Sequence, residues 1–247
     1  SDFASDAAQA YSEVVERLAK QGAKWVQFDE PFLVKDLSDQ DQALFKQLYN
    51  VILSHKGSVK VLLQTYFGDV RDIYQQLTQL PFDGLGLDFV EGKQTAQLVR
   101  SGFPDNKVLF AGVVNGKNIW RNPYQKTIDL LNSLPVKHLV VTTSCSLLHV
   151  PITTENEDFK PAVKQHLAFA KEKLTELNDL SAILDGQGQA KLADNEQLFA
   201  HPRVQEDAEL RKRIDSLSED DFTRKPARAE REKIQKAEFK LPLLPTT

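Results

Sequence analysis

The sequence has little sulfur: among its 247 residues there is no methionine and one cysteine, Cys145. A single thiol excludes an internal disulfide framework and any metal site built from several thiolates of this chain. No apolar run approaches the roughly 20 residues that a membrane-spanning helix needs. The N-terminus also lacks the basic and then apolar segments of a secretory signal. We therefore expect a cytoplasmic protein.

The sequence also lacks a strong excess of one charge, because 31 Lys and Arg face 35 Asp and Glu, for a net charge of −4. We expect neither nucleic acid nor a membrane as a partner, because both attract strongly basic proteins. The hydrophobic content of 41% is enough for one sizeable core. Two features, the missing initiator methionine and the apolar run at residues 241–247, lead us to expect a fragment of a longer protein.

Short apolar runs alternate with segments of helical spacing along the first 185 residues. We predict five strands, at residues 24–29, 59–65, 85–89, 107–113 and 137–143, and helices at residues 7–21, 39–55, 70–79, 93–101, 124–134 and 158–184. Strands separated by single helices form right-handed βαβ units and a parallel sheet. A closed barrel needs eight strands. We therefore predict an α/β fold, a partial (β/α)8 TIM barrel with about five C-terminal strands.

An open doubly wound sheet is the alternative fold, although no Gly-x-Gly-x-x-Gly turn follows any strand. The composition changes after about residue 185, and 21 of the 40 residues at 201–240 are charged. Helical apolar spacing persists at residues 203–217 and 222–238, which predicts surface helices; a solvated charged tail is the other reading. We predict two regions, the partial barrel at 1–185 and a charged helical linker at 186–247.

Polar side chains follow each predicted strand. In a barrel the carboxyl ends of the strands form the active face, so these side chains are the candidates for a functional pocket. The candidates are Asp29, Glu30, Gln64, Tyr66, Asp88, Asn115, Cys145 and His149.

Two groupings among the strand-end residues would suit a catalytic role, and each also has a simpler explanation. Asp29 and Glu30 opposite Asp88 and Glu91 would suit the two carboxylates of a stand-alone barrel hydrolase. Acids that follow a strand also cap helices or pair with basic residues. Cys145 and His149 would suit a nucleophile and its base, or the cysteine is a structural residue behind the pocket.

The segment Asn115-Gly116-Lys117-Asn118 would suit a phosphate or carboxylate ligand, or it forms a plain turn. A metal site would draw on His149, Cys145, Asp88 and Glu91. Gln64 and Tyr66 stand where further ligands would be useful, and neither is a good zinc ligand. We therefore expect no metal in this chain.

Several strand-end segments together resemble the N-terminal barrel of cobalamin-independent methionine synthase. The resemblance runs in order over essentially the whole chain. Its segments are Trp25 to Pro31, Leu63 to Phe67, Gly112 to Arg121, Ser144 to Pro151 and Phe239 to Thr247. The Asn-Gly-Lys-Asn-Ile-Trp and Ser-Cys-Ser-Leu-Leu-His stretches are the most specific of these.

The resemblance implies a parent protein that moves a methyl group from 5-methyltetrahydrofolate, usually polyglutamylated, to homocysteine. It implies two barrels that arose by duplication, with a zinc ion in the C-terminal barrel that activates the homocysteine thiol. Residues 1–185 would then be the C-terminal part of the N-terminal barrel, and residues 186–247 the inter-barrel linker. The C-terminal catalytic barrel would be the partner.

The implied duplication allows the two barrels to be compared position by position. Gln64 and Tyr66 stand where the C-terminal barrel has a His-x-Cys ligand pair, Asp88 stands near its glutamate ligand, and Cys145 near its last cysteine. We therefore expect a degenerate metal site and assign no catalytic residue. The favoured reading is a scaffold without zinc. There are two alternatives. One is a hydrolase, and the other is a folate-polyglutamate binding module that uses Lys117 and Arg121.

Overall fold

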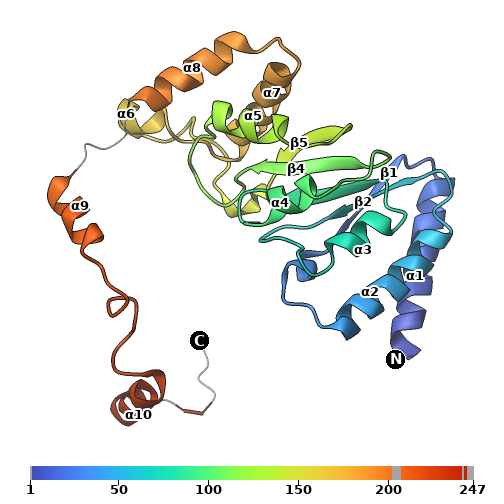
Figure 1. The fold of residues 1–247 in the computed structure, drawn as a ribbon, viewed down its shortest axis with the longest axis horizontal. Helices are drawn as coiled ribbons and strands as arrows, with labels where there is room; N and C mark the ends of the chain where they lie inside the picture. The colour runs from blue at the N-terminus through green and yellow to red at the C-terminus, as the bar shows by residue number, and fades with distance from the viewer. Residues whose placement is uncertain (1, 202–206, 241, 244–247) are drawn as a thin grey trace. The chain divides into compact units, whose positions relative to one another are not determined.

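The computed structural model describes residues 2–201, 207–240 and 242–243. The chain forms two compact units, residues 1–203 and residues 204–247, and we treat each separately (Figure 1). None of the helices in the described residues combines the length and the apolar character that crossing a membrane demands.

The first unit is built on one parallel sheet with the strand order β1-β2-β3-β4-β5. The strands are β1 (Trp25–Asp29), β2 (Lys60–Gln64), β3 (Gly84–Asp88), β4 (Val108–Val114) and β5 (Leu139–Thr143). Each strand pairs in parallel with the next one in the sequence. The predicted five-stranded parallel α/β fold is confirmed, and its sequential order is that of part of a barrel.

The two faces of this sheet differ in what covers them. Residues that point to one face, such as Val61, Leu85 and Leu109, are buried in the hydrophobic core. We call this the covered face. The opposite face, here the open face, carries Gln27, Asp29, Leu62, Gln64, Phe110, Val140 and Thr142, which line a single cavity. Side chains alternate between the two faces because the period of a strand is two residues.

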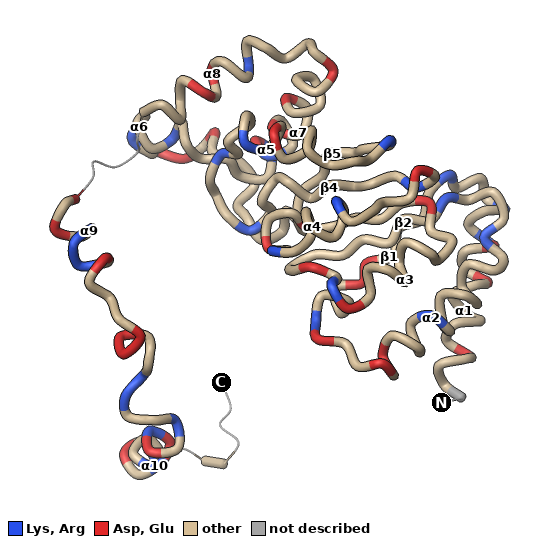
Figure 2. The backbone as a smooth tube through the Cα atoms, viewed as in Figure 1, with Lys and Arg blue, Asp and Glu red and all other residues tan. Residues whose placement is uncertain are grey.

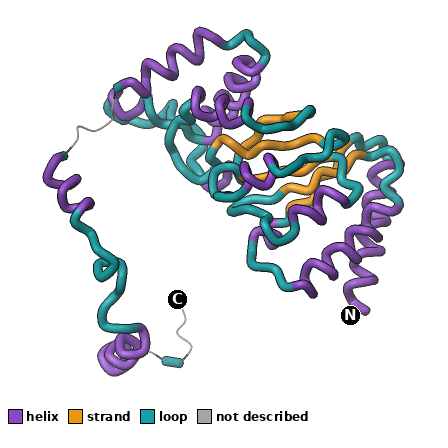
Figure 3. Tube along the Cα trace, in the orientation of Figure 1, coloured by secondary structure: helices purple, strands orange, loops and turns teal. Residues whose placement is uncertain are grey.

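Helices follow the strands and supply the core of the covered face. Between and before the strands lie α1 (Asp2–Lys20), α2 (Asp39–Ser54), α3 (Tyr74–Gln79), α4 (Thr95–Arg100) and α5 (Tyr124–Asn132). Figure 3 shows the strands as one layer in the middle of the first unit, with helices at its flanks. Ser38 is the N-cap of α2, since its hydroxyl accepts a hydrogen bond from the Asp41 amide at 3.2 Å.

The prediction of one continuous helix at residues 158–184 is wrong. The chain forms a single turn, α6 (Pro161–Lys164), and then the long helix α7 (Ala170–Leu184). Between them Leu167 forms an antiparallel bridge with Trp120, and the Ala168 amide donates to the Ile119 carbonyl at 2.8 Å. Leu167 and Ala168 are buried by this pairing. Helical spacing could not reveal it, because the partner segment lies far away in the sequence.

One helix was not predicted at all. Helix α8 (Gln189–Ala200) lies beyond the boundary that we predicted at residue 185. It packs against α5 and α7 and belongs to the first unit. Its Asn195 is buried and hydrogen-bonded to the segment that precedes α5.

The second unit contains two charged helices, α9 (Ala208–Asp215) and α10 (Arg228–Phe239). They confirm a helix in each predicted segment, 203–217 and 222–238, although residues 222–227 form turns and loop and residues 203–206 lie outside the described residues. Basic and acidic residues follow one another closely along both helices (Figure 2). Apolar side chains on them, including Leu210, Ile214 and Ile234, are about half exposed.

Candidate functional site

The carboxyl ends of the strands bring four of the eight predicted residues together. Asp29, Gln64, Tyr66 and Cys145 line a cavity of about 500 Å³ on the open face. Glu30, Asp88, Asn115 and His149 are not part of its lining. Strand ends of a parallel sheet meet at one edge, but the strand pattern alone does not say which of their residues face a cavity.

Asp88 is held by backbone amides and is not a free carboxylate. It is 1% exposed. Its Oδ2 accepts from the Phe67 amide at 2.9 Å, and its Oδ1 accepts from the Val90 and Glu91 amides at 2.8 and 2.9 Å. Burial raises the pKa of Asp88, and the three amides oppose that rise. Asp88 therefore shapes two loops at the strand ends.

The other acids of the proposed hydrolase pair are also engaged. The Tyr49 hydroxyl of helix α2 donates to Glu30, and burial raises the pKa of Glu30. Glu91 forms an ion pair with Lys117 at 2.7 Å. Only Asp29 lines the cavity. These contacts contradict a pair of catalytic carboxylates, because three of the four acids have structural partners and only Asp29 lines the cavity.

Cys145 is a buried thiol just after β5. It is 5% exposed, and burial raises the pKa of its thiol, which disfavours the thiolate that a nucleophile requires. Within the described residues no hydrogen bond joins it to His149, whose ring instead packs edge-on against Phe67 at a centroid distance of 5.6 Å. The arrangement contradicts a Cys-His nucleophile pair and supports the structural role.

The Asn-Gly segment after β4 forms a hydrogen-bonded turn. The Asn115 Oδ1 accepts from the amides of Lys117 and Asn118 at 2.8 and 3.0 Å, as an Asx turn does. The Lys117 ammonium lies 2.7 Å from the Glu91 carboxylate and 5.2 Å from the Phe67 ring centroid. The lysine that would hold a phosphate or a folate carboxylate thus already has an acidic partner.

Phe67 is a residue that the sequence analysis did not single out. Its backbone has φ of 76°, the left-handed region that a bulky residue rarely occupies. The Asp88 carboxylate accepts its amide hydrogen, and its ring packs against Tyr66 and His149. A sequence gives no signal for this conformation in phenylalanine, because the strain is offset by tertiary contacts.

The residues present do not fit a zinc ion. In the part of the chain that the structure describes, no group of three or more His, Cys, Asp or Glu side chains is arranged to hold a metal. Of the residues that a metal site would draw on, Asp88 accepts three amides, Glu91 pairs with Lys117, and the raised pKa of Cys145 disfavours its thiolate. Gln64 lies over Gly86 and donates to the Thr65 carbonyl at 2.9 Å.

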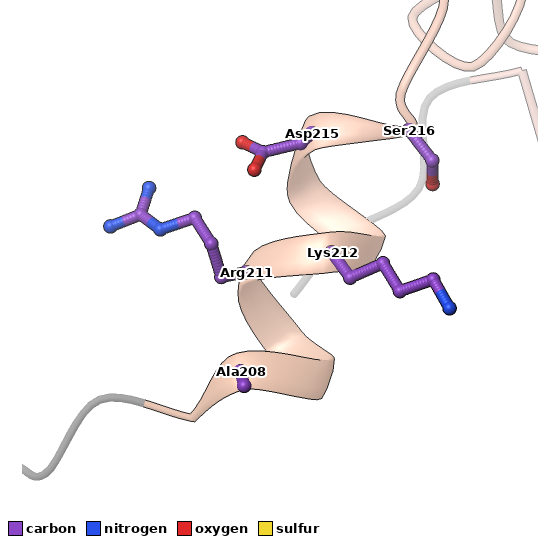
Figure 4. Close-up of a pocket in the computed structure, with 5 residues that line it drawn as sticks. All are labelled: Ala208, Arg211, Lys212, Asp215 and Ser216. Carbon is purple, nitrogen blue, oxygen red and sulfur yellow. The ribbon is translucent and has the colours of Figure 1, made fainter.

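A second shallow cavity lies in the second unit and offers no catalytic arrangement. It is lined by Ala208, Arg211, Lys212, Asp215 and Ser216, all of them on or next to helix α9. Figure 4 shows Lys212 pointing away from Arg211 and Asp215. The side chains belong to a single exposed helix, so they do not enclose a ligand.

Fold and site together define the class: a segment of a β/α barrel with polar groups in its strand-end pocket. The chain matches the profile of the family described as "Cobalamin-independent synthase, N-terminal domain" over residues 1–138. This is more than half of the chain, and the chain belongs to that family.

Curated relatives agree with this assignment. A protein of Streptococcus gordonii is 59% identical and one of Streptococcus thermophilus is 58% identical, each over 246 residues. Both are named 5-methyltetrahydropteroyltriglutamate–homocysteine methyltransferase. Each alignment covers 100% of this chain and 33% of the relative, so the chain spans about a third of the length of these relatives.

Proposed function

We propose that this chain is a non-catalytic scaffold within a methyltransferase that moves a methyl group from 5-methyltetrahydropteroyltriglutamate to homocysteine. The names of the relatives supply the reaction, and their threefold greater length leaves room for the C-terminal catalytic barrel as the partner. In this proposal the chain braces that barrel and forms part of the wall of the substrate cleft, in the cytoplasm, without nucleic acid or membrane.

The observation that supports the scaffold role is that the reactive groups at the strand ends are buried or contact other groups of the same chain. Asp88 holds three amides, Glu91 holds Lys117, and Cys145 is buried with a raised pKa. Groups that perform acid–base or nucleophilic chemistry must reach the substrate and hold a suitable protonation state. These groups instead define the shape of the loops.

The zinc ion implied by the family resemblance would then be held outside this chain. The poor fit of Gln64, Asp88 and Cys145 to a zinc ion supports a degenerate copy of the site. The chain's own residues would supply shape and support to the cleft.

A purified preparation of the 247-residue chain tests this proposal. We expect no transfer of methyl groups to homocysteine and substoichiometric zinc by elemental analysis, with a full-length relative as the positive control. Turnover accompanied by one tightly bound zinc per chain would overturn the scaffold role.

Substitutions in the full-length parent protein give a second test. Replacing a residue that acts in acid–base catalysis lowers kcat by about 100-fold or more. We expect Cys145→Ala to lower kcat by less than about tenfold, because the thiol has no chemical task. A loss of several hundredfold in kcat, with thermal stability unchanged, would assign Cys145 to the catalytic machinery.

A further inference from the structure

A buried polar cluster lies away from the open-face cavity, where helices α7 and α8 meet the segment between β4 and α5. We call residues 115–123 the β4–α5 loop. Two charged residues of α7 reach this loop from the core: Lys173, which is 0% exposed, and Glu176, which is 2% exposed. Charged side chains are almost never buried this completely unless they are paired, so their contacts require an explanation.

Both charged side chains bind the loop through its polar groups. The Lys173 ammonium donates to the Trp120 carbonyl at 3.2 Å and lies 3.5 Å from the Asn118 Oδ1. The Glu176 Oε1 accepts from the Asn122 amide at 2.8 Å. The two residues stand three positions apart on α7, which places them on the same side of the helix. They therefore attach the loop at two points along its length.

Asn122 is the point where the attachments meet. Its amide donates to Glu176, and its carbonyl accepts from the Asn195 Nδ2 of α8 at 3.0 Å. Its side chain donates to the Val113 carbonyl at 2.9 Å and accepts from the Thr127 hydroxyl at 2.6 Å. Four different elements thus determine the position of this residue, and only the Glu176 contact involves a group that titrates.

The Glu176 carboxyl is incompletely satisfied. Its Oε2 is buried and has no hydrogen-bond partner. A buried carboxylate oxygen without a partner costs free energy that a neutral carboxyl largely avoids. The charged and titratable groups around it are Lys173 and Asp179 on α7, Arg121 in the loop, Tyr124 on α5, and Lys191 on α8 through its ion pair with Asp179.

We propose that Lys173 and Glu176 form a pH-sensitive latch that holds the β4–α5 loop against α7 and loosens as the pH rises. Burial raises the pKa of Glu176 to about 7; the hydrogen bond from the Asn122 amide, Lys173 and Arg121 oppose that rise, and Asp179 adds to it. In the attached state Glu176 is therefore neutral below about pH 7. Detaching the loop would expose the carboxyl to water, where its pKa is ordinary, so ionisation favours detachment.

The latch concerns a loop at the carboxyl end of β4, next to the open-face cavity. The Gly116 amide in this loop donates to the Ser144 hydroxyl at 3.1 Å. Ser144 directly precedes Cys145, which lines the cavity. The proposal stands independently of the methyl-transfer reaction, since it is argued from contacts within the chain.

Hydrogen exchange of the Asn122 amide in the full chain tests the latch. We expect its protection factor, corrected for the intrinsic pH dependence of exchange, to fall by about tenfold between pH 6 and pH 9. In Glu176→Gln, which keeps an acceptor for the amide but does not titrate, the protection factor should be constant over this range. A pH-independent protection factor in the wild type, or an equal fall in Glu176→Gln, would overturn the proposal.

Two further variants separate titration from general loosening. Lys173→Met removes a charge that lowers the pKa of Glu176, so the midpoint of the loss of protection should move up by about one pH unit. Asn195→Ala removes an attachment that does not titrate, so protection should fall by the same factor at every pH. An unmoved midpoint in Lys173→Met would also contradict the latch.

Discussion

The two faces of the sheet are made from the same five strands and yet differ in every property that matters for stability. On the covered face Val61, Leu85 and Leu109 are completely or almost completely buried. On the open face Trp25 and Val140 are each 40% exposed, beside polar residues that line the cavity. The difference shows that apolar residues of a strand belong to a hydrophobic core only where helices pack on that face of the sheet.

The largest effect should come from the covered face. Leu85→Ala removes a fully buried side chain and should lower the free energy of unfolding by about 4 kcal/mol, through lost burial and the resulting cavity. The matched change on the other face, Val140→Ala, should cost less than about 1 kcal/mol because Val140 is already partly in water. Urea denaturation of both variants measures the difference; equal costs would show that the open face is also a core.

The second-largest effect should come from Glu176, a titratable side chain that is buried in the first unit. Burial raises the pKa of Glu176 to about 7, above its value in the unfolded chain, so its contribution is fully present at pH 4 and is lost as the pH rises through 7. Relative to Glu176→Gln, the wild type should lose about 3 kcal/mol of unfolding free energy between pH 4 and pH 8. Parallel stability curves for the two proteins across this range would contradict the raised pKa.

Glycines on the open face should respond according to what lies over them. A Cβ added at Gly112 would lie 2.9 Å from the Ser144 Cα and 3.0 Å from the Leu87 carbonyl oxygen, so Gly112→Ala should cost about 2 kcal/mol. At Gly86 the nearest atom is the side-chain oxygen of Gln64, which can rotate away. Gly86→Ala should therefore cost about 1 kcal/mol or less, chiefly through the lost Gln64 hydrogen bond. Thermal denaturation would rank the two, and the reverse order would refute this account of the open face.

The smallest effect should come from the exposed ion pair at the strand ends. Lys117 and Glu91 lie 2.7 Å apart with side chains 45% and 33% exposed. Glu91→Gln should change the free energy of unfolding by less than about 0.5 kcal/mol, because solvent screens the pair. A double-mutant cycle with Lys117→Met measures the coupling, and a value well above this limit would indicate that the strand-end loops are as rigid as the covered face.

Sequence patterns predicted the elements that depend on local signals. The five strands were found because each is a short apolar run, and α2 was found because residues 39–55 show helical spacing. The break between α6 and α7 and the whole of α8 were missed. Both depend on distant partners: Leu167 pairs with Trp120, and α8 is fixed by contacts of Asn195 with the segment before α5.

The candidate site divides in the same way. Four of the eight candidates, Asp29, Gln64, Tyr66 and Cys145, line one cavity of the sheet. The sequence could not show that Asp88 would accept hydrogen bonds from three backbone amides or that Lys117 would pair with Glu91. Nor could it show that Phe67 would adopt a left-handed backbone conformation. Such outcomes depend on loops that approach one another only in the folded chain.

By itself the sequence determined the parallel α/β order of the first unit, the charged helices of the second and the set of polar residues at the strand ends, because these follow from apolar periodicity and chain connectivity. Only the tertiary structure decided which face of the sheet is covered, which strand-end acids are engaged, and that Lys173 and Glu176 lie buried against the β4–α5 loop. The physical reason is that burial and hydrogen bonding depend on what packs against a residue, and the packing partners lie far apart in the sequence.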